Sequence, residues 1–151
     1  MPTHFTGSRA EMRTLDTFIK MTRCTNSVLT RLAERNTVGD LTYSQFAVLE
    51  ALYHLGSMTQ GEVSTKVLKS GSNMTTVIDN LERDGLVRRE RDAKDRRVIN
   101  VHLTEAGSEK VEAVFPGHVA ALVEEFSVLS ASEQLALGEL CKKLGKGQES
   151  E

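Results

Sequence analysis

The fold is decided by residues 72–103, which read SNMTTVIDNLERDGLVRRERDAKDRRVINVHL. In the first half, apolar residues recur at spacings of three and four, which predicts a helix from about Ser72 to Asp84. Gly85 stands where a left-handed C-terminal cap belongs. The second half changes to β-branched and arginine-rich runs on either side of the polar tip 92–96, which predicts a two-stranded hairpin. The helix is expected to bury Met74, Val77, Ile78 and Leu81.

A shorter helix is predicted immediately before this one. Thr59 and Glu62 have the spacing of a capping box, and residues 70–72, Ser-Gly-Ser, end the helix that follows. Its apolar side consists of Val63, Val67 and Leu68. Two helices joined by a short turn and followed by a basic hairpin are the plan of a winged helix-turn-helix. In that plan the second helix enters the major groove of DNA and the hairpin reaches the neighbouring backbone or minor groove.

Long helices are predicted on both sides of this region. Residues 10–35 carry one amphipathic pattern, and a capping box at Thr42 opens a second helix that stops at Gly56. Thr104 starts another helix, which Pro116 should kink, and Ser130 begins the last one. The second helix is expected to bury Phe46, Leu49, Leu52 and Tyr53, and the last helix carries Leu137, Leu140, Cys141 and Leu144 on one face.

The predicted fold class is α+β and mostly helical, with a winged helix-turn-helix at residues 41–104 and a helical dimerisation domain formed by both termini, residues 1–40 and 105–151. The apolar stripes on residues 15–33 and 111–144 exceed what one small winged domain can cover, and exposed patches of that extent rarely survive on monomers. We therefore expect a homodimer. Two-fold symmetry then requires a pseudo-palindromic operator in double-stranded DNA.

Composition excludes several classes of protein. The chain has 151 residues, 39% of them hydrophobic and 26% charged, as in an ordinary folded domain. No apolar run approaches the roughly 18 residues of a bilayer span, so we expect a cytoplasmic protein without membrane partners. The net charge of -2 argues superficially against a nucleic-acid partner, yet residues 86–97 hold six basic and three acidic side chains. Such crowded cations repel one another unless a polyanion is present, although a hairpin edge protected by charge against aggregation is the alternative.

The candidate DNA contacts follow from these two elements. The polar face of the predicted second helix shows short hydrogen-bonding side chains and one cation, a set that suits base edges and phosphates, although a solvated polar face is the alternative. The candidates on the helix are Ser72, Asn73, Thr75, Thr76, Asn80 and Arg83, and those on the hairpin are Arg88, Lys94, Arg96 and Arg97.

Four segments resemble the successive signatures of MarR-type regulators. They are LTYSQFAVLEAL at 41–52, SNMTTVIDNLERDGLV at 72–87, DRRVINVHLTEAG at 95–107 and LSASEQLALGELCKKL at 129–144. The resemblance implies a DNA-binding homodimer whose N-terminal and last two helices interlock. It places base or phosphate contacts on Ser72, Asn73, Thr75 and Thr76, and on Arg97 either a minor-groove contact or a salt bridge to Asp79.

Two details refine this resemblance. Thr76 and Asn80 occupy positions where arginine is frequent in the family, which shifts the expected phosphate contacts toward the hairpin. The segments LEALYHLG, LKSGSNMTTVIDNLERDGLVRR and LCKKLG are similar to the branch that contains the methylhydroquinone-responsive repressor, which implies aromatic or quinone-like inducers. Repression is the expected sign of regulation, because a dimer that covers a promoter excludes polymerase more easily than it recruits it.

A small aromatic or phenolic ligand is expected at the junction of the dimerisation helices and the winged region, from where it would release DNA. The first helix interrupts its apolar stripe with threonines, and such a mixed crevice could hold a ring and orient its polar group, unless these threonines merely tune helix packing. The candidate residues are Phe18, Met21, Thr22, Thr25, His54 and Phe115.

Other functions are weighed against this one. Cys24 is a candidate redox sensor, since some MarR-type proteins sense peroxides through a cysteine on the first helix, whereas Cys141 should be a small core residue. The histidines, His4, His54, His102 and His118, show no metal-ligand spacing, so no metal or cofactor is expected. No nucleophile with its base or phosphate-cradling loop indicates an enzyme. The remaining alternatives are a winged helix that binds protein instead of DNA, and a small hydrolase or transferase.

Overall fold

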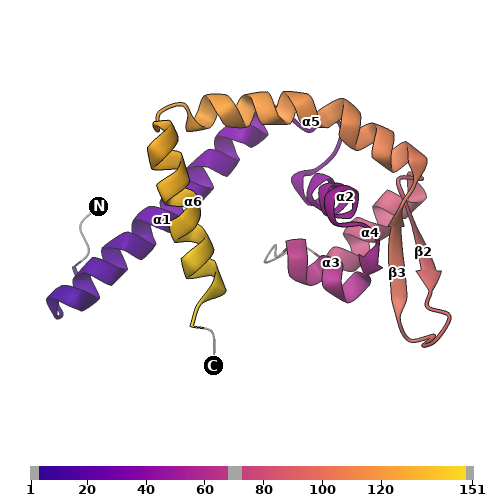
Figure 1. The fold of residues 1–151 in the computed structure, drawn as a ribbon, viewed down its shortest axis with the longest axis horizontal. Coiled ribbons are helices and arrows are strands. Elements are labelled where there is room, and N and C mark those ends of the chain that lie inside the picture. Colours follow the sequence, from indigo (N-terminus) through magenta and orange to yellow (C-terminus); the bar gives the residue numbers. More distant parts are fainter. Residues whose placement is uncertain (1–3, 68–72, 149–151) are drawn as a thin grey trace. The chain divides into compact units, whose positions relative to one another are not determined.

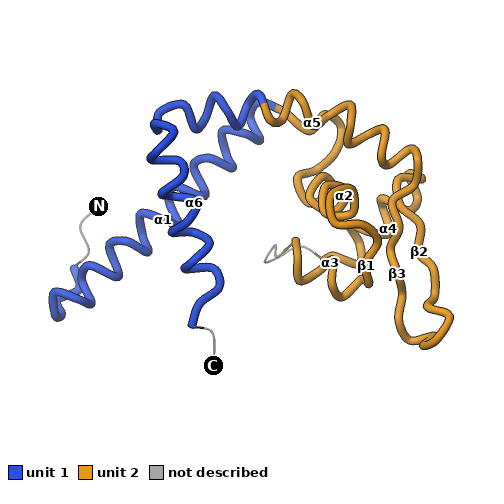
Figure 2. Tube along the Cα trace, in the orientation of Figure 1, with its two compact units in different colours: residues 1–35, 120–151 blue, residues 36–119 orange. Residues whose placement is uncertain are grey.

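The computed structural model describes residues 4–67 and 73–148 and confirms the mostly helical α+β class (Figure 1). In chain order the elements are α1 (Arg9–Glu34), α2 (Tyr43–Leu55), β1 (Met58–Thr59), α3 (Gln60–Val67), α4 (Met74–Arg83), β2 (Val87–Arg91), β3 (Ile99–Leu103), α5 (Glu105–Phe126) and α6 (Ala131–Lys146). The chain divides into two compact units, coloured separately in Figure 2. We call residues 1–35 and 120–151 the helical unit and residues 36–119 the winged unit.

Local side-chain caps set where most helices begin. The Thr42 side chain accepts a hydrogen bond from the backbone nitrogen of Gln45, and the Gln45 side chain accepts one from the backbone nitrogen of Thr42, which starts α2 as predicted. The same reciprocal pair forms between Thr59 and Glu62 before α3, and at the predicted start of α6. Ser8 caps α1 in the same way, through a reciprocal pair with Glu11. These helix starts are therefore fixed by contacts three residues apart.

The hairpin is part of a three-stranded antiparallel sheet in the order β1-β3-β2. β2 and β3 pair from Val87 opposite Leu103 to Arg91 opposite Ile99, which confirms the predicted hairpin. β1 was not predicted, because its two residues are too few to show an alternating pattern. It pairs Met58 with Val101 and so attaches the segment before α3 to the hairpin.

The core of the winged unit lies between α2, α4, α5 and the sheet. Ile78 and Leu81 of α4 are fully buried, as predicted. The prediction for Tyr53 is wrong: its side chain is 38% exposed and its hydroxyl donates to the Glu112 carboxylate, while Val48 of the same helix is fully buried. The buried cluster consists of Val48, Leu49, Leu52, Met58, Val63, Ile78, Leu81, Val87, Val101 and Val111.

The helical unit contains few buried side chains. Arg31 and Arg35 of α1 bind the carboxylates of Glu125 and Glu124 of α5 at 2.7 and 2.8 Å. Every described residue of α6 is exposed, including Cys141, so the prediction that this cysteine is a core residue is wrong for the single chain. The apolar stripe that predicted its burial is present, but the described residues of the chain do not cover it.

No single helix within residues 4–67 and 73–148 combines the length and hydropathy needed to cross a membrane. α5 and α6 reach that combination only when they are taken together, across the bend that separates them.

Candidate DNA-contact surface

The start of α4 presents threonine hydroxyls to solvent. Asn73 is the N-terminal cap, with its side-chain oxygen 3.3 Å from the backbone nitrogen of Thr76. This cap fixes the first turn, so that Thr75 and Thr76 are both exposed. Ser72, the remaining candidate at this helix start, lies outside the described residues.

The rest of the outer face of α4 is weakly charged. Asn80 is half-buried, and Arg83 is exposed with its Nε 3.6 Å from the carboxylate of its neighbour Asp84. A helix that offers hydroxyls, amides and one terminal cation has little with which to neutralise phosphates. Its chemistry therefore suits hydrogen bonding to base edges.

Two aspartates shape the tip of the hairpin, which we call the wing tip (residues 92–97). Asp92 accepts hydrogen bonds from the backbone nitrogens of Asp95 and Lys94 at 3.1 and 3.0 Å and from the side chain of Asn100, and these bonds hold its pKa below the usual value. Asp95 accepts from the side chain and the backbone nitrogen of Arg97, which lowers its pKa as well. Because both carboxylates are engaged in the turn, the cations beside them project outward.

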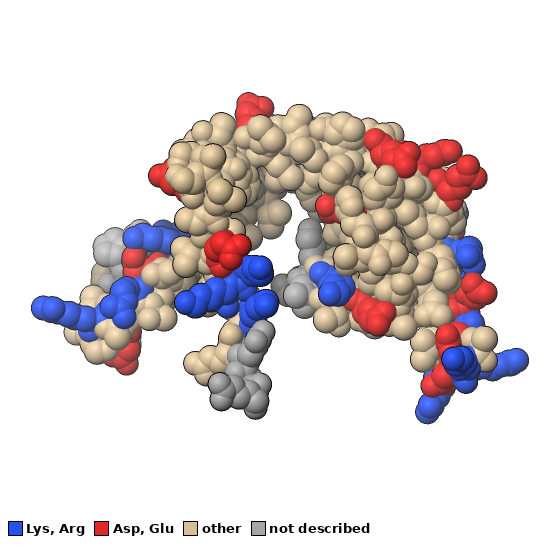
Figure 3. All heavy atoms as spheres, in the orientation of Figure 1, with Lys and Arg blue, Asp and Glu red and all other residues tan. Residues whose placement is uncertain are grey.

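Lys and Arg gather at the wing tip in Figure 3. Among the described residues, the charged groups of Lys94 and Arg96 have no carboxylate partner within ion-pair distance, and both side chains are exposed. Arg88, by contrast, is bound to Glu90 at 2.9 Å. Among the described residues of the hairpin, the exposed cations without a carboxylate partner are therefore Arg91, Lys94 and Arg96, and the last two lie at the wing tip.

The two predicted contacts of Arg97 have separate outcomes in the structure. Arg97 binds Asp95, and its side chain is 92% exposed. Asp79, the partner implied for Arg97, instead binds Arg89 of β2. The salt-bridge alternative for Arg97 is therefore wrong, because Arg89 already occupies Asp79, and a contact with DNA remains the prediction for Arg97.

Arg89 is a residue that the sequence analysis left out of the candidate contacts. It shares the inward face of β2 with Val87, since alternate strand residues point to the same side. Its side chain is only 17% exposed. The alternation of Val87 and Arg89 is a sequence signal that could have marked Arg89 as an inward-facing cation.

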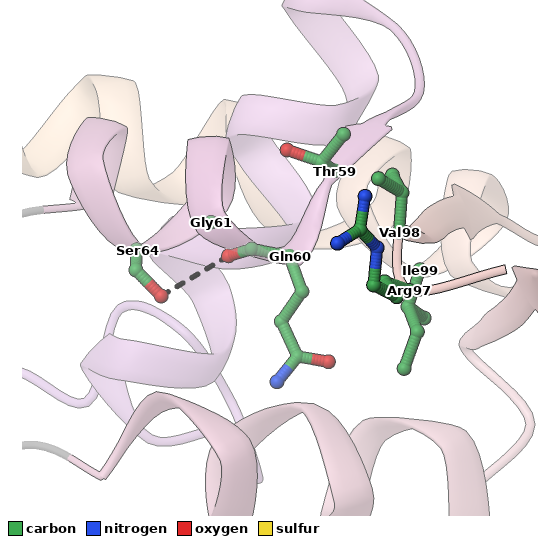
Figure 4. A pocket seen from close by; sticks show the side chains of 7 residues that line it. All are labelled: Thr59, Gln60, Gly61, Ser64, Arg97, Val98 and Ile99. Carbon is green, nitrogen blue, oxygen red and sulfur yellow. Dashed lines mark hydrogen bonds between the residues drawn. The ribbon is translucent and has the colours of Figure 1, made fainter. Parts of the chain in front are cut away.

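A hollow of about 460 Å³ lies beside the wing (Figure 4). Figure 4 shows the side chain of Arg97 facing Thr59 and Gln60, while the Ser64 hydroxyl donates to the backbone carbonyl of Gln60 at 3.1 Å. The remaining lining residues are Gly61, Val98 and Ile99. A guanidinium beside polar side chains can bind an anionic group by donating hydrogen bonds to it, for example to a phosphate oxygen.

The six candidate ligand residues fall in both units. In the helical unit, the hydroxyls of Thr22 and Thr25 donate to the carbonyls of Phe18 and Met21 at 2.9 and 3.0 Å. Their hydrogens are therefore engaged by the backbone of α1, and only their lone pairs are available to a ligand. Phe18 and Met21 also line a hollow of about 280 Å³ with Leu144.

The remaining two ligand candidates meet in the winged unit. The rings of His54 and Phe115 lie 5.2 Å apart between centroids, and Tyr53 packs edge-on to His54 at 5.1 Å. These three side chains form an aromatic cluster between α2 and α5. Such a cluster can pack against a planar ring.

His118 is a packing residue of the winged unit. Its ring is 8% exposed, lies edge-on to Phe46 at 4.9 Å, and its Nδ1 is 3.1 Å from the hydroxyl of Thr37. Burial lowers the pKa of His118 from its ordinary value, while the charge of Glu50 opposes this shift. Cys24 is exposed and free. Within residues 4–67 and 73–148, no three His, Cys, Asp or Glu side chains come together in a way that could hold a metal ion.

Comparisons with known proteins agree with this arrangement. The sequence model of the MarR family matches residues 41–99. The HTH-type transcriptional regulator MhqR of Bacillus subtilis is 33% identical over 133 residues, which are 88% of this chain and 92% of that protein. The HTH-type regulator YkoM of the same organism is 41% identical over 102 residues, 68% of this chain and 66% of its own length.

A solved structure extends the likeness to three dimensions. The Bordetella bronchiseptica regulator BpsR, described with the regulation of its DNA binding by 6-hydroxynicotinic acid, is 26% identical with a TM-score of 0.65. The match covers 80% of this chain and 98% of BpsR.

Proposed function

This chain belongs to the MarR family of transcriptional regulators, whose members bind DNA and act as dimers, and from this premise we propose that it is a repressor that occupies a pseudo-palindromic operator. The observation that carries the proposal is the wing tip. Lys94 and Arg96 project without a carboxylate partner among the described residues, beside a helix that offers hydroxyls to base edges. In this arrangement the wing supplies affinity for phosphate, and α4 supplies the choice of sequence.

The test is selection of bound sequences from a random duplex pool, followed by affinity measurements over a range of salt concentrations. Arg96→Gln should weaken binding and reduce the magnitude of the salt slope by about 0.9, the value for one phosphate contact. Lys20→Gln removes a cation that is also exposed, on α1 of the helical unit, and should change neither quantity. Wild-type binding without sequence preference or salt dependence would support the alternative of a winged helix that binds protein.

We propose that the helical unit forms the dimer. The exposed apolar residues Leu135, Leu140 and Leu144 of α6 and Phe18 of α1 are between 58% and 73% exposed in the single chain. Such a surface is typical of an interface between subunits. The half-sites of the operator should then lie about one helical turn apart, roughly 34 Å.

Light scattering at micromolar concentration tests the dimer. Leu140→Glu places a charge on the proposed interface and should give a monomeric mass with weaker operator binding. Leu55→Glu is the matched control, because Leu55 of the winged unit is 62% exposed and Leu140 is 64% exposed. A dimeric Leu140→Glu variant, or a monomeric wild type, contradicts the assignment.

We further propose that a small phenolic ligand releases the operator. BpsR is regulated by a hydroxylated aromatic acid, and in this chain the free lone pairs of Thr22 and Thr25 suit a ligand that donates a hydrogen bond, as a phenol does. The rings of His54 and Phe115 add a second group suited to an aromatic ring. For release, the ligand must bind more tightly to a state that does not fit the operator.

Titration of salicylate and substituted hydroquinones into the protein–operator complex tests this proposal. Thr22→Val keeps the shape of the side chain but removes its acceptor, and should raise the concentration needed for release. Thr30→Val, on the same helix and also exposed, serves as the control. Cys24→Ser separates the redox alternative, because release that vanishes in this variant would come from thiol chemistry. Release by none of the compounds removes the support for a ligand site.

A further inference from the structure

The side chain of Gln60 connects the recognition helix α4 to the sheet. Its Oε1 accepts a hydrogen bond from the Nε of Arg89 at 3.1 Å, and its Nε2 donates to the Thr75 hydroxyl at 3.3 Å. Gln60 is the first residue of α3, Arg89 lies in β2, and Thr75 lies in the first turn of α4. A single amide therefore joins a half-buried cation to a residue predicted to contact a base or a phosphate.

The orientation of this amide is determined by chemistry. The Nε of an arginine can only donate, so the oxygen of Gln60 must face Arg89 and its NH₂ group must face Thr75. The Thr75 hydroxyl then accepts from Gln60. Its own hydrogen points elsewhere, and within the described part of the chain no acceptor is bonded to it, while the side chain is exposed.

Arg89 is held firmly enough to set this orientation. Its Nη1 binds the carboxylate of Asp79, its Nη2 donates to the Thr75 carbonyl at 3.3 Å, and its backbone nitrogen donates to Glu82 at 2.9 Å. The guanidinium thus contacts two turns of α4 while its Nε faces Gln60. Because the side chain is 17% exposed, these bonds are partly shielded from water.

We propose that Arg89 and Gln60 are positioning residues that orient the Thr75 hydroxyl as a hydrogen-bond donor, so that the protein selects an acceptor edge at one position of each half-site. This inference rests on the proposed DNA-binding function. A threonine hydroxyl can pair with donors or acceptors, and the amide of Gln60 occupies one of its two lone pairs while leaving its hydrogen free, which favours an acceptor on the DNA. The acceptors in the major groove are purine N7, guanine O6 and thymine O4.

Gln60→Glu should reverse the orientation of the Thr75 hydroxyl while keeping hydrogen bonds from residue 60 to both Arg89 and Thr75. A carboxylate still accepts from Arg89, but it cannot donate, so the Thr75 hydroxyl would donate to it and present lone pairs to DNA. The preferred base at the position read by Thr75 should then change to one that donates, through adenine N6 or cytosine N4. The expected change in relative affinity is about fivefold, the value of one neutral hydrogen bond.

The measurement is competitive binding to the operator selected by the wild type, with every base pair substituted in turn. Thr75→Val removes the hydroxyl at nearly constant shape and so identifies the position that Thr75 reads. The general repulsion between the new carboxylate and DNA lowers affinity for every sequence and cancels in these ratios. In Gln60→Glu, the base preferences at all other operator positions should match those of the wild type.

Three outcomes decide the proposal. An unchanged preference of Gln60→Glu at the position that Thr75→Val identifies would overturn the inference while leaving the proposed function intact. Should Gln60→Glu not fold, Gln60→Leu serves instead. Leucine leaves the Thr75 hydroxyl free to rotate, so the base preference at the position read by Thr75 should fall below about twofold. A base preference equal to that of the wild type would overturn the inference. A wild type that selects no sequence would overturn the proposed function and this inference with it.

Discussion

Replacement of Gly107 by alanine is expected to destabilise the winged unit. Gly107 lies in the first turn of α5 and is buried, and a Cβ at this position would lie 2.1 Å from the backbone oxygen of Leu86 and 2.7 Å from the Cδ1 of Leu103. The Leu86 oxygen already accepts from the backbone nitrogen of Thr104 at 3.1 Å, and the Thr104 hydroxyl donates to the oxygen of Gly85 at 2.7 Å. Backbone cannot turn away as a side chain can, so the start of α5 must move from the base of the hairpin.

The magnitude follows from these contacts. Overpacking costs about 1–3 kcal/mol, each weakened hydrogen bond about 1 kcal/mol, and the better helix propensity of alanine returns about 1 kcal/mol. With two hydrogen bonds weakened, the free energy of unfolding should therefore fall by about 2–4 kcal/mol. Gly117→Ala is the matched control in the same helix, since nothing lies within 4 Å of its added Cβ. It should raise stability by about 0.5–1 kcal/mol.

Urea unfolding followed by far-ultraviolet circular dichroism measures both variants. Protein concentration must be held constant, because dimerisation contributes to apparent stability. If Gly107→Ala were as stable as Gly117→Ala, the close approach of α5 to Leu86 would not exist in solution, and the argument from steric contact would be refuted.

Three further predictions concern the DNA-contact surface and a buried titratable group. Arg97→Ala should weaken operator binding by about 1–3 kcal/mol, the range of one good nucleic-acid contact, and unchanged affinity at physiological salt with the fold intact would remove its role. Thr76→Ala should alter the preferred base at one operator position more than it alters the salt dependence, which a comparison of substituted operators measures. Burial lowers the pKa of His118, so below about pH 6.5 the unfolded chain binds more protons at this site than the folded chain, and stability falls as pH falls. The unfolding free energy of His118→Gln should decline less steeply in this range, and equal slopes for the two proteins would contradict the assignment.

The parts of the fold that the sequence predicts are those fixed by neighbours along the chain. Thr42 and Thr59 start their helices through partners three residues away, so their spacing alone is sufficient. β1 depends on Val101, a partner 43 residues from Met58, and two residues carry no pattern of their own. Tyr53 was placed in the core because its spacing fits the apolar stripe of α2, yet at the border of that stripe its hydroxyl reaches a carboxylate.

In the candidate site, too, features fixed by near neighbours in the chain are predictable, whereas those that depend on distant partners are not. The hydroxyls and cations of the DNA-contact surface are visible as residue types, and their exposure follows from helical and strand periodicity. Which arginine binds Asp79 is a matter of distance between β2 and α4, and Arg89 and Arg97 are both arginines of the same hairpin. Strand alternation marks Arg89 as an inward-facing residue, but it does not show which acidic residue of α4 lies within its reach. The role of Gln60 depends on three elements meeting, so no local pattern contains it.

At the wing tip, different residues fix the shape of the turn and carry its positive charge, and this has an evolutionary consequence. Asp92 and Asp95 hold the turn through backbone nitrogens, whereas Lys94 and Arg96 contribute no side-chain bond to it among the described residues. Mutations at the two cations can therefore retune how strongly the regulator holds DNA while the hairpin keeps its form. Mutations at the two aspartates alter the hairpin itself. A duplicated copy of this gene could thus drift in operator affinity through residues 94 and 96, one substitution at a time, without passing through an unfolded intermediate.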